Sequence, residues 1–179
     1  MNELNQTIEN ERPTQRRFAV MGENTFIITN KLMKNQRLCR LLKYPSKNPF
    51  ALEEKGVPQP DVDGIDLINK QILIIPKIYD DSIEKMSYVT AIFDEFITGQ
   101  INPDFKLSTI RFVIACPYDE WILNDHSLRP YLIMEEIDQM FNKAELKGIG
   151  KLQFVRADIL TLSSQIGGYS MEYSIHEFN

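Results

Sequence analysis

The sequence has little of the side-chain chemistry on which most enzymes depend. Its 179 residues include two cysteines, Cys39 and Cys116, and two histidines, His126 and His176. Two thiols in distant segments do not make a disulfide framework, and no Cys-x-x-Cys or histidine spacing indicates zinc. Motifs of the P-loop, GxGxxG, HExxH and GxSxG types are also absent. We therefore expect neither enzymatic activity nor a cofactor or metal.

Long apolar runs are missing as well. Runs such as Ile72–Ile75 fall far below the roughly 20 residues that span a bilayer. The first residues, MNELNQTIENERPTQRR, lack the apolar region of a signal peptide. The net charge of −5 argues against a dedicated nucleic-acid-binding protein, which carries a basic face. We expect a reduced, intracellular setting and no contact with a membrane.

The composition is that of one globular domain. With 43% hydrophobic and 25% charged residues, the chain can build a core of ordinary size. Residues 1–17 are polar and predict a flexible N-terminal arm, which either frays or becomes ordered on a neighbour. Residues 18–179 predict a single α+β domain.

Residues 26–43 have helical spacing, with Asn24 or Thr25 as a possible N-cap. The predicted apolar stripe is Phe26, Ile27, Leu32 or Met33, Leu38, Leu41 and Leu42. The other faces carry the cations Lys31, Lys34, Arg37, Arg40 and Lys43. These cations indicate either a solvated face or a surface that docks on an acidic partner.

A second helix is predicted over residues 128–145, with Pro130 in its first turn and Asp125 or Ser127 as its cap. Its core-facing stripe is Ile133, Met134, Ile137, Met140, Phe141 and Ala144. The acidic residues Glu135, Glu136 and Asp138 lie where the helix dipole favours negative charge. Since nothing nearby completes a catalytic carboxylate pair, we interpret them as a solvated face or a negative rim in an oligomer.

Residues 44–70 form a long loop rich in proline and glycine, which are breakers of regular structure. A loop of this length packs on its own domain or on a neighbouring subunit. It contains Asp61, Asp63 and Asp66, but the glycine and glutamate positions of an EF-hand are not met. We interpret these aspartates as turn formers.

The remaining segments predict strands, at residues 71–78, 88–98, 107–116, 151–162 and 169–175. Pro76 marks an edge or an end of the first strand. The second and third form a long antiparallel hairpin around Asn102-Pro103-Asp104, with Ile110, Phe112 and Ile114 on one face. Gly167 and Gly168 are assigned to the turn before the last strand, in which Tyr169, Met171, Tyr173 and Ile175 alternate with polar residues. The predicted fold is α+β, a mainly antiparallel sheet packed by the C-terminal-half helix and the N-terminal helix.

Cys116 and His126 could suggest a nucleophile and a base. Cys116 ends an apolar strand before Pro117, and no oxyanion-hole glycine pattern accompanies it. A buried structural thiol is the better interpretation, and His176 is interpreted as a solvated histidine on a polar strand face.

Three segments carry a resemblance to a known family. They are NKLMKNQRLCRLLKYPSKNPF, the strand that ends in FVIACPYDEWIL, and LRPYLIMEEIDQMFNKAELKGIGKLQF followed by GGYSMEYSIHEF. Over most of residues 25–179 the chain resembles tailed-bacteriophage virion proteins of the head–tail neck, of the tail-terminator or connector type. The resemblance implies a small α+β protomer in a closed ring, commonly of six-fold or twelve-fold symmetry, at the junction of capsid connector and tail tube.

The resemblance also implies partners and a location. We expect a homo-oligomeric ring in the virion neck, assembled in the host cytoplasm, that contacts other neck, portal-side and tail proteins. Genomic double-stranded DNA would pass through the lumen without sequence-specific binding, which suits an acidic chain. The residues expected to contact partners are Phe50, Leu52, Arg37, Arg40, Trp121, Arg129 and Tyr131.

Two rival classes stay open. A small cytoplasmic hydrolase or nuclease would need a convergent polar pocket, for example one that joins Cys116 to His126. A monomeric adaptor protein would not form a symmetric ring.

Overall fold

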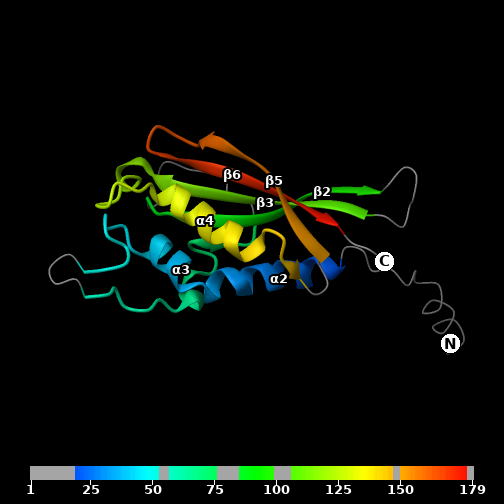
Figure 1. Cartoon of the computed structure of the whole chain (residues 1–179), viewed down its shortest axis with the longest axis horizontal. Coiled ribbons are helices and arrows are strands. Elements are labelled where there is room, and N and C mark those ends of the chain that lie inside the picture. Colours follow the sequence, from blue (N-terminus) through cyan, green and yellow to red (C-terminus); the bar gives the residue numbers. More distant parts are fainter. Residues whose placement is uncertain (1–18, 53–56, 76–84, 99–105, 147–149, 177–179) are drawn as a thin grey trace, which may run out of the picture.

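The computed structural model describes residues 19–52, 57–75, 85–98, 106–146 and 150–176. It is an α+β fold with a mostly antiparallel, curled sheet, as predicted. The six strands lie in the order β1-β2-β3-β6-β5-β4, and helices cover one face (Figure 1). The elements are α2 (Ala19–Lys34), α3 (Gln36–Lys43), η1 (Gly64–Leu67), β1 (Ile72–Leu73), β2 (Tyr88–Thr98), β3 (Lys106–Pro117), η2 (Tyr118–Glu120), α4 (Arg129–Phe141), β4 (Glu145–Leu146), β5 (Gly150–Thr161) and β6 (Ile166–His176).

Two long hairpins build the sheet. The β2–β3 hairpin is the predicted one, and β3 pairs antiparallel with β6, which pairs in turn with β5. The short β1 runs parallel to β2 at the edge of the sheet, which is one of the two predicted alternatives, and it is much shorter than residues 71–78. Pro76 lies outside the described residues. The predicted arm at 1–17 and the turn at 102–104 lie outside the described residues.

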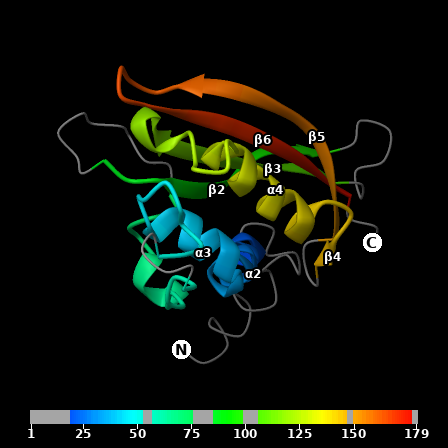
Figure 2. The same cartoon turned by 60° about the vertical axis from the view of Figure 1, so that its left-hand side comes forward.

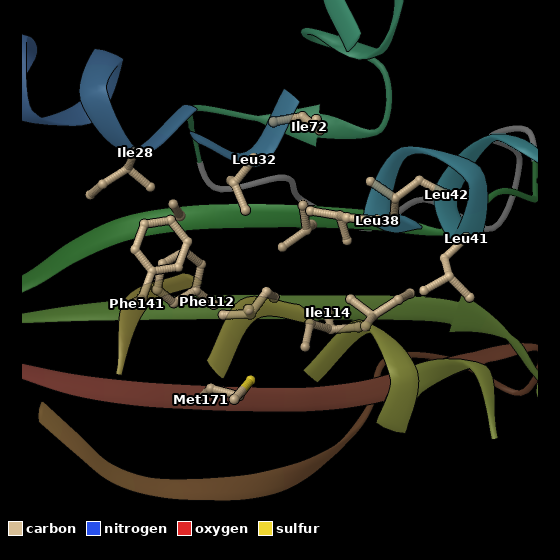
Figure 3. Close-up of a cluster of buried hydrophobic side chains, with 14 of the residues drawn as sticks. Ile28, Leu32, Leu38, Leu41, Leu42, Ile72, Phe112, Ile114, Phe141 and Met171 are labelled. Atoms are coloured by element: carbon tan, nitrogen blue, oxygen red, sulfur yellow. The ribbon is translucent and has the colours of Figure 1, made fainter. Parts of the chain in front are cut away.

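The core lies between this sheet and the helix layer. Phe112 is central, with its ring 4.9 Å from that of Phe141 on α4 and 5.6 Å from that of Tyr173 on β6. Figure 3 shows Ile28, Leu32, Leu38, Leu41 and Leu42 of α2 and α3 with Phe112, Ile114 and Met171 of the sheet. The predicted faces of β3 and α4 are therefore confirmed: Ile110, Phe112, Ile114, Ile133, Ile137 and Phe141 are all buried.

The single helix predicted over residues 26–43 is instead two helices. Asn35 adopts an extended conformation between them and caps α3, because its side-chain oxygen accepts a hydrogen bond from the amide of Leu38 at 3.0 Å. The first helix starts at Ala19, so Asn24 and Thr25 lie within it and the predicted caps are wrong. Phe26 is exposed, because the buried face of α2 is the one that carries Ile28 and Leu32.

Further predictions fail near α4 and β6. Leu128, without a side-chain cap, precedes α4, while Asp125 and Ser127 hydrogen-bond to each other. Gly167 and Gly168 lie in β6, opposite Cys116 and Ala115 of β3, and the turn precedes them. These glycines permit close packing: a Cβ atom on Gly168 would lie 1.9 Å from the carbonyl oxygen of Ile114.

The loop at 44–70 packs on its own domain. An isolated bridge joins Ala51 to Pro58, and η1 lies against α2 and α3. Asp63 caps η1, because its carboxylate accepts a hydrogen bond from the backbone amide of Ile65. This confirms the interpretation of Asp63 as a turn former.

Replacing Gly168 with alanine tests this close approach. We expect Gly168→Ala to lower the free energy of unfolding by roughly 2–3 kcal/mol, because backbone atoms of β3 must shift. Urea denaturation followed by circular dichroism measures the loss.

Gly22 on α2 is the matched control, because a Cβ atom there meets nothing within 4 Å. Gly22→Ala should raise stability by about 0.5–1 kcal/mol through helix propensity. Equal effects of the two variants would contradict the packing that we describe.

Candidate functional site

The side chain of Arg129 joins three segments of the chain. Although we expected it to be exposed, it is fully buried, so that expectation is wrong. Its Nη1 donates to the carbonyl oxygens of Leu41 and of Tyr44, the latter at 2.8 Å. Its Nη2 donates to that of Ser46 at 2.6 Å, and its Nε to that of Glu120 at 3.1 Å. Because the guanidinium is used within its own chain, we do not assign Arg129 to a partner surface.

The charge of Arg129 lies beside the carboxylate of Glu120 in this buried position. The Glu120 carboxylate lies 3.9 Å from Nε and accepts a hydrogen bond from Ser87 at 3.2 Å. Burial raises the pKa of Glu120, and Arg129 and Ser87 oppose that rise. Burial likewise lowers the pKa of Arg129, which Glu120 opposes. The pair and the carbonyl oxygens together compensate the cost of burying the cation.

Two cations of α3 also have partners in their own chain. The Nε of Arg37 lies 2.6 Å from the carboxylate of Glu136, and Arg40 pairs with Asp61 at 2.7 Å. Glu136 is buried and also accepts from Asn35, so its assignment to a solvated face is wrong. Contact of Arg37 and Arg40 with an acidic partner stays a prediction.

A similar correction applies to Asp138. It accepts a hydrogen bond from the hydroxyl of the buried Tyr173 at 2.8 Å, which ties α4 to β6. Burial raises the pKa of Tyr173, and Asp138 raises it further. Of the three acids, Glu135 is the one that lies on an exposed face, as predicted.

Trp121 and Tyr131, both predicted as partner contacts, belong to one continuous surface. We call the side chains of Tyr118, Trp121, Tyr169 and Tyr131 the aromatic row. Successive ring centroids along this row are 5.2, 6.3 and 5.3 Å apart. The hydroxyl groups of Tyr131 and Tyr169 are hydrogen-bonded at 3.0 Å. The row therefore connects η2, β6 and α4 at one end of the sheet.

The aromatic row continues onto β5, which the helix layer leaves largely uncovered. In Figure 2, β5 runs along the side of the sheet away from α2 and α3. Ile159 of β5 is paired with Tyr169 of β6, on the same face of the sheet as α4. Ile159 is 67% exposed and Tyr131 is 49% exposed. An apolar surface of this kind, with aromatic rings beside it, is typical of a protein–protein contact.

Phe50 and Leu52, the other predicted contacts, lie apart from this row in the 44–70 loop. Phe50 packs against the core, and the guanidinium of Arg37 lies 4.6 Å from its ring centre. Leu52 is exposed. Their contact with a partner stays a prediction, and the structure does not bring them together with Trp121 and Tyr131 in any described contact.

Cys116 does not have the environment of a nucleophile. It is buried, and burial raises its pKa to about 12, with smaller opposing effects of Ser87 and Arg129. Burial likewise raises the pKa of Cys39 to about 11. Since the thiolate is the reactive form, a raised pKa disfavours reaction of either thiol at neutral pH, which agrees with the structural interpretation of Cys116. His126 lies in an exposed turn with a φ of 65°.

A metal site and a membrane-spanning helix both need an arrangement that the described residues do not form. Within them, no group of three or more histidine, cysteine, aspartate or glutamate side chains is placed to hold a metal ion. Within the same ranges, no helix is long and apolar enough to cross a bilayer.

Sequence reasoning missed Tyr118, Tyr169 and Ile159 as members of this surface. Tyr169 was assigned to the buried alternation of β6, and its neighbours depend on the strand register. A weak signal existed in Gly167, since a Cβ atom there would lie 2.3 Å from the Tyr118 hydroxyl. A glycine in a strand indicates such a close approach.

The fold and this surface define a small α+β domain whose sheet is covered by helices on one face and left uncovered along β5. The chain belongs to the YomW family, whose model matches residues 35–175, from the cap of α3 almost to the end of β6. This family is phage-derived and of the Bacillus prophage type, so the chain is a phage-related protein. No curated protein matches the chain.

Substitution of Arg129 tests how much its buried hydrogen bonds contribute to stability. We expect Arg129→Met to lower the free energy of unfolding by about 3–5 kcal/mol, because buried carbonyl oxygens and Glu120 lose their partner. Arg129→Lys should recover only part of this, because an ammonium lacks the planar fork of donors. Urea unfolding measures the loss of stability in both variants. An Arg129→Lys variant as stable as the wild type would contradict the role of the planar guanidinium.

The raised thiol pKa values predict a pH dependence. The thiols ionise in the unfolded chain near the ordinary value of 9.0, but in the folded chain only near about 11 and 12. Their contribution to stability is therefore complete below pH 9 and is lost as pH rises through about 11–12. Urea unfolding between pH 8 and pH 11 should show this fall, with a smaller slope in a Cys39→Ala/Cys116→Ala variant. Rapid alkylation of either thiol in the native protein at pH 8 would show the burial to be wrong.

Proposed function

We propose that this phage-related protein is a structural virion protein that forms a ring at the head–tail junction, as a tail terminator or neck connector. The observation that carries the proposal is the uncovered surface of the aromatic row and Ile159. A monomer gains nothing from exposing such side chains, whereas a subunit of an assembly buries them.

The shape of the domain supports a role in assembly. The helix layer, joined by the hydrogen bonds of Arg129, covers one side of the sheet, while the β5 side presents apolar and aromatic groups. Aromatic residues in such positions supply most of the binding energy of protein contacts, because they bury a large area with few rotatable bonds. The partners are other copies of this chain together with neck, portal-side and tail proteins.

The overall charge is compatible with the passage of DNA. A chain with a net charge of −5 repels phosphate, so genomic DNA can move through a lumen of such subunits without adhering. This argument needs no sequence-specific contact to a base.

The location in the particle is tested by imaging. Phage particles that carry an affinity-tagged copy of the chain should show the tag at the neck by electron microscopy, and averaging should show a ring there. Absence of the chain from purified particles, or its presence at a different part of the virion, would overturn the proposal. A strictly monomeric adaptor would give no ring.

The uncovered surface is tested by substitution. Ile159→Ser combined with Tyr131→Ala should weaken incorporation into particles about 10-fold or more, because contacts at the centre of an interface are worth about 2 kcal/mol or more. Quantitative mass spectrometry of purified particles measures the copy number.

The control for this variant is Ile65→Ser. Ile65 lies on η1, away from the aromatic row, and is 68% exposed, compared with 67% for Ile159. It should leave both incorporation and thermal stability unchanged. Equal losses from the two variants would exclude the aromatic row as the specific contact.

A further inference from the structure

A row of alternating charges crosses the face of the sheet that points away from the helices. We call Asp94, Arg111, Glu172 and Arg156 the charge row; they lie on β2, β3, β6 and β5 in that order. Asp94 forms an ion pair with Arg111. Arg111 is opposite Glu172 in the register, and Glu172 pairs with Arg156 at 3.0 Å. The signs along the row are therefore negative, positive, negative, positive.

Both ends of the charge row reach an edge of the sheet. Among the described residues, β1 pairs with β2 only at Val89 and Thr90, and β4 pairs with β5 only at Gly150 and Lys151. At the level of the row, neither edge has a further strand beside it in the described part of the chain. The two terminal side chains are accessible, since 58% of Arg156 and 31% of Asp94 are exposed. The backbone of each edge can therefore accept another strand.

The directions of the edge strands fit a head-to-tail neighbour. Each of the pairs β2–β3, β3–β6 and β6–β5 is antiparallel, so β5 runs opposite to β2. If a second copy continues the sheet from β5 with its own β2, the new pair is again antiparallel. The row then continues with the negative Asp94 after the positive Arg156, and the alternation is unbroken.

We propose that a second copy of this chain binds the β5 edge through its β2 edge, so that Arg156 of one copy pairs with Asp94 of the next. This contact deepens the proposed function and rests on it for its biological setting. It uses two different surfaces, so it is heterologous and leads to a ring if the rotation between copies closes. The aromatic row on the opposite face stays available for contacts to the adjoining neck and tail proteins.

The two edge strands are also protected against unspecific pairing. β2 has a bulge between Phe93 and Glu95, and β5 has one between Phe154 and Arg156. Bulges and charges on an edge discourage pairing with arbitrary strands. A partner therefore has to match both the charge and the local curl of the edge that it joins.

One competing arrangement would also match charges. A two-fold contact between two β5 strands, centred on Ala157, would place Arg156 opposite Asp158. It would leave the β2 edge open, and two-fold contacts alone give a closed pair instead of a ring. The head-to-tail contact is preferred because it pairs both the β2 edge and the β5 edge with a strand of another copy. The experiments below separate the two arrangements.

Cross-linking distinguishes them directly. Adjacent antiparallel strands bring opposite Cα atoms within the range of a disulfide, and the native thiols are buried. A chain with both Asp94→Cys and Arg156→Cys, treated with a mild oxidant that takes up the two electrons of each disulfide, should give a ladder of covalent oligomers. Asp94→Cys alone should give none. Covalent dimers from Arg156→Cys alone would indicate the two-fold contact and overturn the proposal, as would a double variant that yields no oligomers.

Charge reversal gives an independent test in the unmodified backbone. Arg156→Glu and Asp94→Arg should each weaken association roughly tenfold or more, because like charges then face each other. An Asp94→Arg/Arg156→Glu double variant should regain association, and so should a mixture of the two single variants. Analytical ultracentrifugation measures the association, and melting curves show that each variant is folded.

Lys43→Glu and Asp119→Arg are the matched controls, since both residues are exposed and lie outside the charge row. They should leave association unchanged. A wild-type chain that stays monomeric at high concentration, or a double variant that does not recover, would overturn the contact.

The outcomes separate this contact from the proposed function. A ring at the neck of particles made with either single variant would refute the contact and keep the function. Oligomers that depend on the charge row in a protein absent from virions would keep the contact and refute the function.

Discussion

The helix layer of this protein depends on one buried guanidinium. The last carbonyl groups of α3 have no partner within the helix, and the chain then turns through Tyr44 and Ser46 into a proline-rich loop. Arg129 donates to carbonyl oxygens of all these segments and of η2 at the same time. A planar group with several fixed donors can satisfy so many acceptors, and the negative end of the α3 dipole favours its charge. Because Arg129 is also the first residue of α4, this interaction sets where α4 starts relative to α3.

With the helices held in this way, their coverage of the sheet is limited. α2 packs on β1 and β2, and α4 packs mainly on β3 and β6. β5 extends past α4, so its apolar side chains and one of its backbone edges are left for another molecule. The uncovered β5 and the aromatic row support the assembly role that we propose, and the charge row on the other face supports the proposed contact between copies of the chain. The phage origin of the family agrees with a structural role in a particle, which is our proposal.

Much of the fold could be predicted from local pattern. The bounds of β2 and β3 and the start of α4 follow from two-residue and helical periodicity, because the buried faces of these elements are regular. The predicted end of the second helix at residue 145 is wrong, since α4 ends at Phe141. The division at Asn35 could not be predicted from periodicity, since apolar residues with helical spacing lie on both sides of it and a single capping side chain separates the two helices. Gly167 and Gly168 were misassigned because glycine marks both turns and close strand contacts, and only the packing of Tyr118 and Ile114 distinguishes these cases.

The candidate site was predicted less well than the fold. Trp121 and Tyr131 were identified by residue type, but their connection through Tyr169 needs the register of β6 and the position of α4. Arg129 was placed on the surface because arginine is usually exposed, whereas here a set of backbone acceptors stabilises it inside.

The sequence by itself determined the long hairpin, the buried faces of β3 and α4 and the lack of a recognisable catalytic motif, because these depend on residues close together in the chain. Only the tertiary structure decided that Arg129 is buried while Arg156 lies at an edge of the sheet. It also decided which aromatic rings are in contact, and that Asp94 and Arg156, which carry opposite charges, lie at opposite edges of one sheet. These properties depend on the order and register of strands that are far apart in sequence. Strand order and register are set by packing against the whole core, which no local pattern encodes.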